Sequence, residues 1–376
     1  MRFRTPSTLL FGRGRLADLP EILAELGVER PLVVTDPGVA ATGVPERLLA
    51  DLGGAGAGLW DGVAPDPTDE HAERCRDRIA AGGHRSVIAL GGGSVIDVAK
   101  VAAVLATHGG KAADYFGFDR VRRPGLPLVA VPTTPGSGAE VSSHAVLASV
   151  ASRRKEVIAG LHLLPRAAVV DPVLTLTLPP AQTTWSALDG FIHAIEAFLA
   201  RRATPLTDTF ARLAAPAIAR ALPRVLAEGA DLAAREELAL GCLYSGLAMA
   251  NANAGAIHAL GYPLTSRYRI PHGLANALVA AAALERIAPG RPERCNELAG
   301  LLTDGDASPG PTPLAARVRQ LLAACGVGDR LSGWGVHEKD LPELAAAALH
   351  FQSVLANTPV ALGRDDLLAI YRAAWA

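Results

Sequence analysis

The hydrophobic pattern changes at Pro179-Pro180, and this change constrains the fold more than any other feature of the sequence. Before it, short apolar runs alternate with segments of helical spacing, which predicts an open α/β sheet with mostly parallel strands. After it only helical spacing recurs. We therefore expect an α/β domain over residues 1–180 and an all-helical domain over residues 181–376. The predicted strands are 7–11, 31–35, 57–60, 86–90, 128–131 and 168–171, and the predicted helices of the second domain are 181–201, 205–222, 230–250, 256–264, 273–286, 293–302, 313–325, 340–349 and 364–374, with a loop over 304–311.

Composition and charge exclude several classes of protein. The chain has 376 residues, of which 50% are apolar, so it can bury two substantial cores. Its formal net charge is −1 and it has no basic stripe, so we expect no nucleic acid partner. The four cysteines are scattered without a C-x-x-C pair, which fits a reducing compartment and argues against a thiolate metal site. No signal-peptide core follows Met1, and no run of roughly 18 apolar residues could span a bilayer, so we expect a soluble, cytoplasmic protein without a membrane partner.

A glycine-rich turn follows the clearest predicted strand. Gly91-Gly92-Gly93-Ser94 lies directly after the strand at 86–90 and starts a predicted helix. Glycines let backbone N–H groups approach a phosphate, and the helix N-terminus adds the positive end of its dipole. Ser94 can cap that helix. The spacing is neither G-x-G-x-x-G nor a Walker loop, and such a triplet alone is more often only a turn.

Two further features favour a nucleotide at the same edge of the sheet. Thr133 and Thr134 offer hydroxyls just past the strand at 128–131, where open α/β sheets bind ligands. Asp36 ends an earlier strand and is placed like the acid that accepts ribose hydroxyls. A helix N-cap or a turn residue is an equally good interpretation of Asp36 alone, and the case for a nucleotide depends on all three features together.

The second half of the chain contains a candidate metal site. Asp189 and His193 are one helical turn apart and project from one face of a helix, and His258 and His272 supply two more imidazoles. One carboxylate with three neutral imidazoles suits Fe(II), Zn(II), Mn(II) or Co(II), with iron or zinc the most available. An isolated D-x-x-x-H pair is usually a surface pair or a cap, and His272 could be only a turn residue. The metal hypothesis gains its weight from the nucleotide features that precede it.

Four ordered motifs resemble those of the iron-containing (group III) alcohol dehydrogenases. Residues 91–100 match the motif G-G-G-S-x-x-D-x-A-K, residues 132–141 match P-T-T-x-G-[ST]-x-[AS]-E-V, and residues 188–197 match the metal motif D-x-x-x-H-A-x-E. His258 and His272 correspond to the family's last two metal ligands. The resemblance covers essentially the whole chain. It implies a dehydroquinate synthase-like fold, with a dinucleotide-binding domain, an all-helical domain and the active site in the cleft between them.

The resemblance also implies the cofactors and their contacts. NAD is the expected dinucleotide, because Asp36 matches the acid that accepts a 2′-hydroxyl and repels a 2′-phosphate; relatives can tolerate NADP as well. Fe(II) is the usual metal of the family, with Zn(II) as the alternative. Its implied ligands are Asp189, His193, His258 and His272. The implied dinucleotide contacts are Gly92, Gly93, Ser94, Thr133 and Thr134 with the pyrophosphate and ribose, Lys155 with a ribose, and Asp97 in organising the loop or beside the nicotinamide.

Three positions depart from the family's pattern. Tyr262 stands where many members carry a histidine thought to assist proton transfer, and a tyrosine reference pKa of about 10 makes it a poor base near neutral pH. Ala254 leaves room where relatives often have a larger apolar residue lining the substrate pocket. His144 matches a substrate-facing position and could add a polar or cationic contact. We expect a small aldehyde carrying a polar or anionic group; a His144 that faces cofactor or water is an equal alternative.

The expected reaction is the reversible interconversion of a small alcohol and its aldehyde by hydride transfer to or from the nicotinamide. Glu196, on the helix face of His193, is a candidate hydrogen-bond acceptor for a metal ligand, with a solvated glutamate as the alternative. By analogy with relatives we expect a homodimer or a larger homo-oligomer.

Two alternative functions remain. One is a dehydroquinate synthase-like sugar-phosphate cyclase, for which Arg267 and Arg269 are the only local phosphate-binding candidates; the other is a non-catalytic nucleotide-binding or assembly role.

Overall fold

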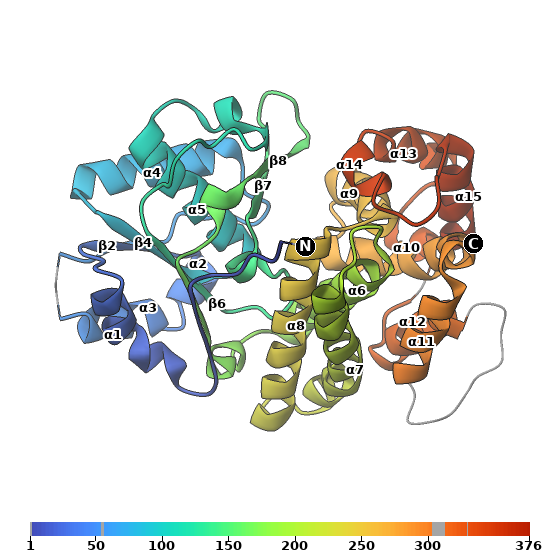
Figure 1. Ribbon diagram of the computed structural model, residues 1–376, viewed down its shortest axis with the longest axis horizontal. Helices are drawn as coiled ribbons and strands as arrows, with labels where there is room; N and C mark the ends of the chain where they lie inside the picture. Colours follow the sequence, from blue (N-terminus) through green and yellow to red (C-terminus); the bar gives the residue numbers. More distant parts are fainter. Residues whose placement is uncertain (1, 54–55, 303–312, 329) are drawn as a thin grey trace. The chain divides into compact units, whose positions relative to one another are not determined.

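The computed structural model describes residues 2–53, 56–302, 313–328 and 330–376, and the loop expected over residues 304–311 lies outside them. The chain forms two compact units. One unit is Arg4–Leu178, and the other is Pro179–Ala376 together with the N-terminal residues up to Phe3. Among the described residues, every strand belongs to the first unit and the second is built from helices (Figure 1). This confirms the predicted fold class, an α/β domain followed by an all-helical domain.

The main sheet of the first unit has six strands in the order β1-β9-β6-β4-β2-β3, and every pairing in it is parallel. Its two central strands β4 and β6 are buried along their whole length, as is typical of a parallel sheet covered on both faces. In their register Gly91 pairs with Pro132, so the segments that follow both strands start side by side. The strands are β1 (Thr8–Phe11), β2 (Pro31–Val34), β3 (Gly58–Trp60), β4 (Ser86–Gly91), β6 (Leu128–Pro132) and β9 (Ala167–Val170).

A second, three-stranded sheet was not predicted. It has the order β5-β8-β7, with β5 at Gly117–Phe118, β7 at His144–Ala148 and β8 at Lys155–Ala159. Strands β7 and β8 form an antiparallel hairpin in which His144 pairs with Ala159 and Ala148 pairs with Lys155. His144 and Lys155 therefore lie at opposite ends of one hairpin.

The helices of the first unit surround the main sheet. Helix α5 is the most buried of them and packs against β4, β6 and β7, so the turn that leads into it is held by the centre of the sheet. Helix α4 packs against α5. The α-helices of this unit are α1 (Leu19–Glu25), α2 (Pro37–Ala40), α3 (Val44–Asp51), α4 (Asp69–Gly82) and α5 (Gly93–His108).

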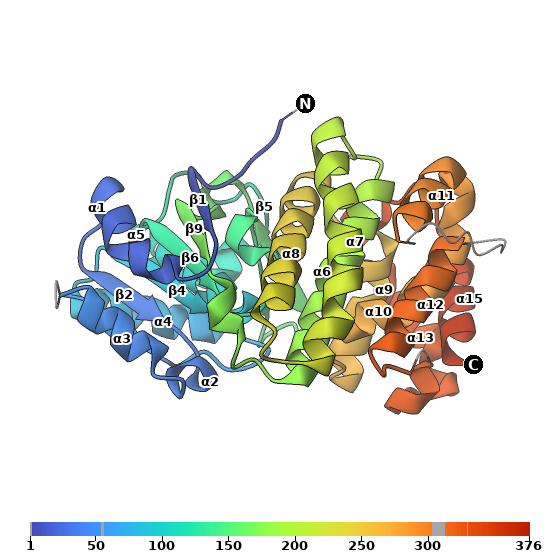
Figure 2. The same ribbon diagram turned by 90° about the horizontal axis from the view of Figure 1, so that it is seen from below.

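Helix α6 is the centre of the second unit. It is buried from Ala187 to Leu199 and packs against α7, α8 and α10, and Figure 2 shows α6, α7 and α8 side by side. A helix that is buried on all sides is typical of such a central position. Helices α7 and α9 continue several residues past their predicted ends although they contain Pro223 and Pro263, so tertiary packing overrides a local helix breaker here. The helices are α6 (Pro180–Leu199), α7 (Pro205–Ala227), α8 (Leu232–Ala252), α9 (Ala256–Tyr268), α10 (His272–Ile287), α11 (Pro292–Leu301), α12 (Pro313–Ala324), α13 (Leu341–Ala348), α14 (Gln352–Leu355), which was not predicted, and α15 (Arg364–Trp375).

Candidate metal centre and nucleotide turn

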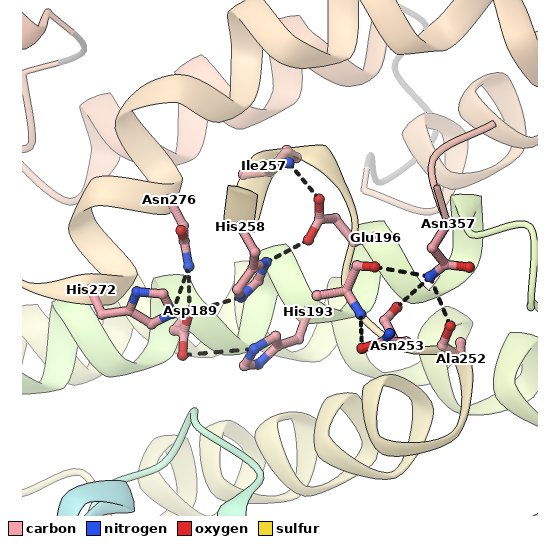
Figure 3. A network of polar contacts seen from close by, with 11 residues as sticks. Asp189, His193, Glu196, Ala252, Asn253, Ile257, His258, His272, Asn276 and Asn357 are labelled. Atoms are coloured by element: carbon pink, nitrogen blue, oxygen red, sulfur yellow. Dashed lines mark hydrogen bonds and ion pairs between the residues drawn. The ribbon is translucent and has the colours of Figure 1, made fainter. Parts of the chain in front are cut away.

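Three helices of the second unit bring the four predicted metal ligands together (Figure 3). Asp189 and His193 lie on α6, and His193 Nε2 is 3.8 Å from Asp189 Oδ2. His258 lies in the first turn of α9, and its Nε2 atom is 3.6 Å from Asp189 Oδ1. His272 is the first residue of α10, and its Nε2 atom is 3.9 Å from the same oxygen. The Asp189 carboxylate is thus faced by three imidazole nitrogens from three helices.

The geometry of this cluster fits a bound cation. One ligand atom each from Asp189, His258 and His272 lies within 4.8 Å of the others. The rings of His193 and His258 stack with centroids 4.7 Å apart. The His258 Nε2 atom is buried without a hydrogen-bond partner, and a metal ion would satisfy it. A set of one carboxylate and three imidazoles suits Fe(II) or Zn(II).

The charges of the cluster are strongly coupled. Burial alone would raise the pKa of Asp189, but the surrounding imidazoles of His193, His272 and His258 hold it well below its usual range. Burial likewise opposes a charge on His258, yet the Glu196 and Asp189 carboxylates raise its pKa to about 10. A cation that binds here therefore replaces a proton in the same electrostatic field.

Glu196 fixes the ring of His258. His258 Nδ1 donates to Glu196 Oε2 over 2.5 Å, and the backbone N–H of Ile257 donates to Glu196 Oε1 over 2.7 Å. Because the Nδ1–H of His258 is hydrogen-bonded to Glu196, a neutral His258 ring presents an unprotonated Nε2 to Asp189. This is the arrangement in which a histidine binds a metal. The predicted acceptor role of Glu196 is confirmed, and the alternative of a solvated glutamate is wrong because Glu196 is buried.

Asn357 contacts the short link between α8 and α9 that precedes His258. Its Nδ2 atom lies 2.9, 3.1 and 2.9 Å from the carbonyl oxygens of Ala252, Asn253 and Ala254, where α8 ends (Figure 3). Asn253 has a φ of 67°, so the chain leaves the helix there in a conformation that few residues adopt. Asn357 binds the carbonyl groups where α8 ends, while Glu196 binds the N–H of Ile257 where α9 starts. Sequence reasoning missed this role.

Asn276 is a second residue of the centre that sequence reasoning missed. It is fully buried on α10, one turn after His272. Its Nδ2 atom donates to Asp189 Oδ1 over 2.9 Å and lies 3.2 Å from His272 Nε2. An asparagine within a run of alanine and leucine was the available sequence signal, because a buried polar side chain needs a partner.

Tyr262 lies beside the candidate metal centre. Its ring stacks on that of His272 with centroids 5.2 Å apart and an interplanar angle of 13°. The ring of Phe351 packs against it with centroids 4.6 Å apart. The tyrosine that replaces the family's histidine therefore supports a predicted metal ligand by stacking.

In the first unit, the glycine turn lies against the segment that follows β6. The Thr133 N–H donates to the Gly91 carbonyl over 3.1 Å. A Cβ at Gly92 would lie 3.1 Å from Thr134 Oγ1, a tight contact, and one at Gly93 would lie 2.8 Å from Ser137 Oγ, so a side chain at Gly93 would force the two segments to shift. The structure thus brings the predicted residues of the turn and the threonines together at the N-terminus of α5.

Ser94 does not cap α5, contrary to the prediction. The helix starts at Gly93 with Gly92 as its N-cap, which places Ser94 inside the first turn. No side chain forms a cap hydrogen bond at this end. No capping side chain therefore occupies the backbone N–H groups of the first turn, and a phosphate-binding helix end requires this.

Two buried ionisable residues of α5 organise the segment that follows the threonines. Asp97 Oδ2 accepts from the Val146 N–H over 2.9 Å, and burial raises the pKa of Asp97 to about 6. Lys100 Nζ donates to the carbonyl oxygens of Ser142 and His144 over 2.8 and 2.7 Å, and burial lowers the pKa of Lys100 to about 8. Asp97 thus holds strand β7, and its two expected roles, organising the glycine loop and lying beside the nicotinamide, stay predictions. Lys100 was matched only as a motif letter.

The remaining predicted contacts have partners within the first unit. Asp36 Oδ1 accepts from the N–H groups of Gly38 and Val39 over 2.9 and 3.0 Å, so Asp36 is the N-cap of α2, the alternative weighed above. Lys155 Nζ pairs with the carboxylate of Asp66. Burial, helped by nearby cations, lowers the pKa of His144 to about 4. The His144 ring is therefore neutral at pH 7, and it can offer a polar contact but not the cationic one considered above.

Two chain-wide expectations also have structural outcomes. All four cysteines are free, and Cys75, Cys242 and Cys295 are buried while Cys325 is half-buried. Within the described residues, no helix is both long enough and apolar enough to cross a bilayer.

Known protein families match nearly the full length of the chain. Residues 6–172 match the family model of iron-containing alcohol dehydrogenases, and residues 183–375 match the model of that family's C-terminal region. The long-chain-alcohol dehydrogenase 1 of Geobacillus thermodenitrificans is 33% identical over 374 residues, covering 97% of this chain and 94% of that protein.

Solved structures extend the agreement to three dimensions. The crystal structure of a 1,3-propanediol oxidoreductase superposes with a TM-score of 0.94 at 32% identity, covering 100% of this chain and 99% of that one. The sulfoacetaldehyde reductase of Bifidobacterium kashiwanohense, solved in complex with NAD+, superposes with a TM-score of 0.90 at 29% identity, covering 99% and 98%. This chain belongs to the iron-containing alcohol dehydrogenase family of oxidoreductases.

Proposed function

We propose that this chain is a metal-dependent, NAD(P)-linked alcohol dehydrogenase that interconverts a small alcohol and its aldehyde. The observation that carries the proposal is the convergence of three imidazole nitrogens on the buried Asp189 carboxylate. Buried ionisable groups are expensive unless they are paired or bind a metal, and this set combines one carboxylate with three imidazoles, the donors that suit Fe(II) or Zn(II). Family membership supplies the reaction class.

Asp189, His193, His258 and His272 would hold the ion, which we take to be Fe(II), with Zn(II) as the alternative. When bound, such an ion supplies Lewis-acid polarisation of the substrate oxygen. Asp189 contributes the negative charge of the site, and Glu196 keeps the Nε2 lone pair of His258 directed inward. The side chains thus define the position of the ion before any substrate enters.

The first unit would bind the dinucleotide. Gly92, Gly93 and the N-terminus of α5 offer backbone donors to the pyrophosphate, and Thr133 and Thr134 add hydroxyls. Both capping hydrogen bonds of Asp36 go to Oδ1, so its Oδ2 retains the capacity to accept from a ribose hydroxyl, which favours NAD over NADP. A relative of this family is solved with NAD+ bound.

We further propose an aldehyde with a polar or anionic group as the substrate. His144 carries a neutral imidazole at pH 7, which can donate one hydrogen bond to an anionic oxygen. A relative with the same fold is a sulfoacetaldehyde reductase, whose substrate carries a sulfonate. Ala254 leaves more room than a larger apolar residue would.

Tyr262 is proposed to position His272 and to donate a hydrogen bond, and not to act as a general base. The phenol's reference pKa of about 10 leaves it protonated near neutral pH. Its stacked contact with His272 restricts the rotation of that ring. Tyr262→Phe, which keeps the ring and removes the hydroxyl, should preserve metal content.

The structure disfavours the sugar-phosphate cyclase. That reaction requires basic side chains for a substrate phosphate near the metal. Arg267, one of the two local candidates, is engaged by the carboxylates of Asp340, over 3.0 Å, and Glu343. The family match extends over both units of the chain and is to dehydrogenases.

The decisive experiment is oxidation of NADH and of NADPH by Fe(II)-loaded protein, prepared without oxygen, with matched panels of neutral and anionic small aldehydes. Turnover of either panel supports the dehydrogenase. Failure of every aldehyde, with metal and dinucleotide both bound, would overturn it.

His144→Ala tests the substrate class. It should raise KM for anionic aldehydes about tenfold, the effect of one lost hydrogen bond to a charged group, and leave KM for neutral aldehydes unchanged. Equal effects on both panels would contradict the role of His144.

A further inference from the structure

The amide of Asn276 touches two of the predicted ligands at once. Its Nδ2 atom is 2.9 Å from Asp189 Oδ1 and 3.2 Å from His272 Nε2. The same carboxylate oxygen faces His258 Nε2 over 3.6 Å. One donor group therefore lies within the small volume in which the ligand atoms converge (Figure 3).

The orientation of this amide is fixed by charge. An amide nitrogen can only donate and a carboxylate oxygen can only accept, so the NH2 group must face Asp189. Turning the amide over would place two acceptor oxygens against each other in a buried site. The cost of the observed orientation is visible on the other side, where Asn276 Oδ1 is buried without a hydrogen-bond partner.

Helix packing leaves the amide no space to move away. A Cβ at Gly261 of α9 would lie 1.9 Å from Asn276 Oδ1, so α9 passes directly over the amide and only glycine fits there. A Cβ at Gly273 of α10 would lie 2.0 Å from the Trp185 carbonyl oxygen of α6, so α10 also approaches α6 as closely as backbone allows. Asn276 is thus enclosed by the three helices that carry the ligands.

The contact with His272 selects one form of that ring. Because the amide nitrogen is a donor, the ring nitrogen that faces it accepts and carries no proton. A neutral His272 then has its proton on Nδ1 and its lone pair on Nε2, on the side of Asp189. This is the tautomer that binds a metal through Nε2, and a bound metal would take this lone pair from the amide hydrogen bond of the metal-free form.

We propose that Asn276 is a positioning residue of the metal centre, which holds the Asp189 carboxylate and keeps His272 in the tautomer that binds a metal. The inference rests on the proposed metal-dependent function. Partners of metal ligands typically change metal affinity by about 10- to 100-fold when they are removed. The role differs from that of a core residue, which would change stability and leave affinity unchanged.

The test uses Co(II) as the probe, because its visible spectrum reports the ligand geometry. Asn276→Leu keeps the approximate volume and removes the donor, and Asn276→Ala removes it without added bulk should the leucine variant fold poorly. Val279→Ala, fully buried on the same helix, is the control for packing. For each purified full-length protein we would measure the Co(II) dissociation constant by chelator competition, the Co(II) spectrum, NAD+ affinity and the Tm of the metal-free form.

Both Asn276 variants should bind Co(II) about 10- to 100-fold more weakly with an altered spectrum, while NAD+ affinity stays unchanged. Val279→Ala should lower Tm and keep the affinity and spectrum of the wild type. In metal-free protein with 15N-labelled histidine, Asn276→Leu should reduce the signal of an unprotonated Nε2 at His272. Co(II) binding by Asn276→Leu within about twofold of the wild type, with the same spectrum, would overturn the positioning role. Absence of Co(II) binding by the wild type would instead overturn the metal-dependent function itself.

Discussion

The two units build their candidate sites in opposite ways. The metal centre of the helical unit consists of side chains, and other side chains hold two of them: Glu196 holds His258, and Asn276 holds Asp189. The nucleotide turn of the α/β unit consists mainly of backbone, and glycines are needed there because two segments approach closely. The metal centre depends on the chemical identity of its side chains. The nucleotide turn depends on how closely its two backbone segments approach. Substitutions should therefore act differently on the two.

Removal of a metal ligand should give the largest effect. Asp189→Ala takes away the only carboxylate among the four predicted ligands and leaves three imidazoles around a small void. We expect metal content to fall below detection and aldehyde reduction to drop by about three orders of magnitude or more, several kcal/mol of transition-state stabilisation. NADH affinity, measured by fluorescence titration, should stay within about twofold. A parallel loss of NADH binding would show that the two sites are not separable.

The partner of a ligand should matter next. Glu196→Gln keeps the shape of the side chain and removes its charge, so the hydrogen bond to His258 Nδ1 is weakened while the N–H of Ile257 keeps an acceptor. Metal affinity should fall about 10- to 100-fold. The matched control is Glu237→Gln on α8, which removes a carboxylate paired with Arg220 and Arg224 at the surface and should leave metal affinity unchanged. Equal metal affinity in both variants would argue that Glu196 has only a structural role.

A change of shape should be the test of the nucleotide turn. A Cβ at Gly93 would lie 2.8 Å from Ser137 Oγ, so Gly93→Ala forces apart the two segments that offer donors to the dinucleotide. We expect about a tenfold weaker affinity for NADH with metal content unchanged, the reverse of Asp189→Ala. Gly300→Ala is the control, since a Cβ there meets nothing within 4 Å. Unchanged NADH affinity in Gly93→Ala would remove the turn from the proposed dinucleotide site.

The two sites also differ in how far the sequence predicts them. The strands β4 and β6 and the buried helix α6 follow from near-continuous apolar runs, which tolerate few alternative folds. The hairpin of β7 and β8 does not, because its short strands are only partly buried and its turn lacks glycine and asparagine; Arg153 adopts a φ of 54° there instead. A positive φ at arginine is uncommon, so sequence alone gives no reason to place a turn at that position.

Ligands are easier to predict from sequence than the residues that hold them. Asp189 and His193 have a helical spacing that can be recognised without any fold. Asn357 contacts backbone carbonyls 105 positions away, and Asn276 contacts a carboxylate 87 positions away. Such contacts depend on how the helices pack. Only the general expectation that a buried amide has a partner pointed to them.

Glu140, a buried carboxylate in the segment that follows Thr133 and Thr134, should affect stability and not binding. Burial raises the pKa of Glu140 from 4.5 to about 7. Between these values the folded chain keeps a proton that the unfolded chain has released. The contribution of this group is therefore complete below pH 4.5 and is lost as the pH rises to about 7. Glu140→Gln lacks this loss.

Urea unfolding of the wild type and Glu140→Gln at pH 5 and pH 7.5 measures the difference. The variant should gain about 1–3 kcal/mol relative to the wild type on going to the higher pH, since one pKa unit corresponds to about 1.4 kcal/mol. Asp97, with its pKa raised to about 6, acts in the same direction but is present in both proteins, and Lys100, with its pKa lowered to about 8, titrates above the window. A relative stability that does not change with pH would mean that Lys100 fully compensates the Glu140 charge, so that this part of the nucleotide unit, like the metal centre, is held by paired side chains.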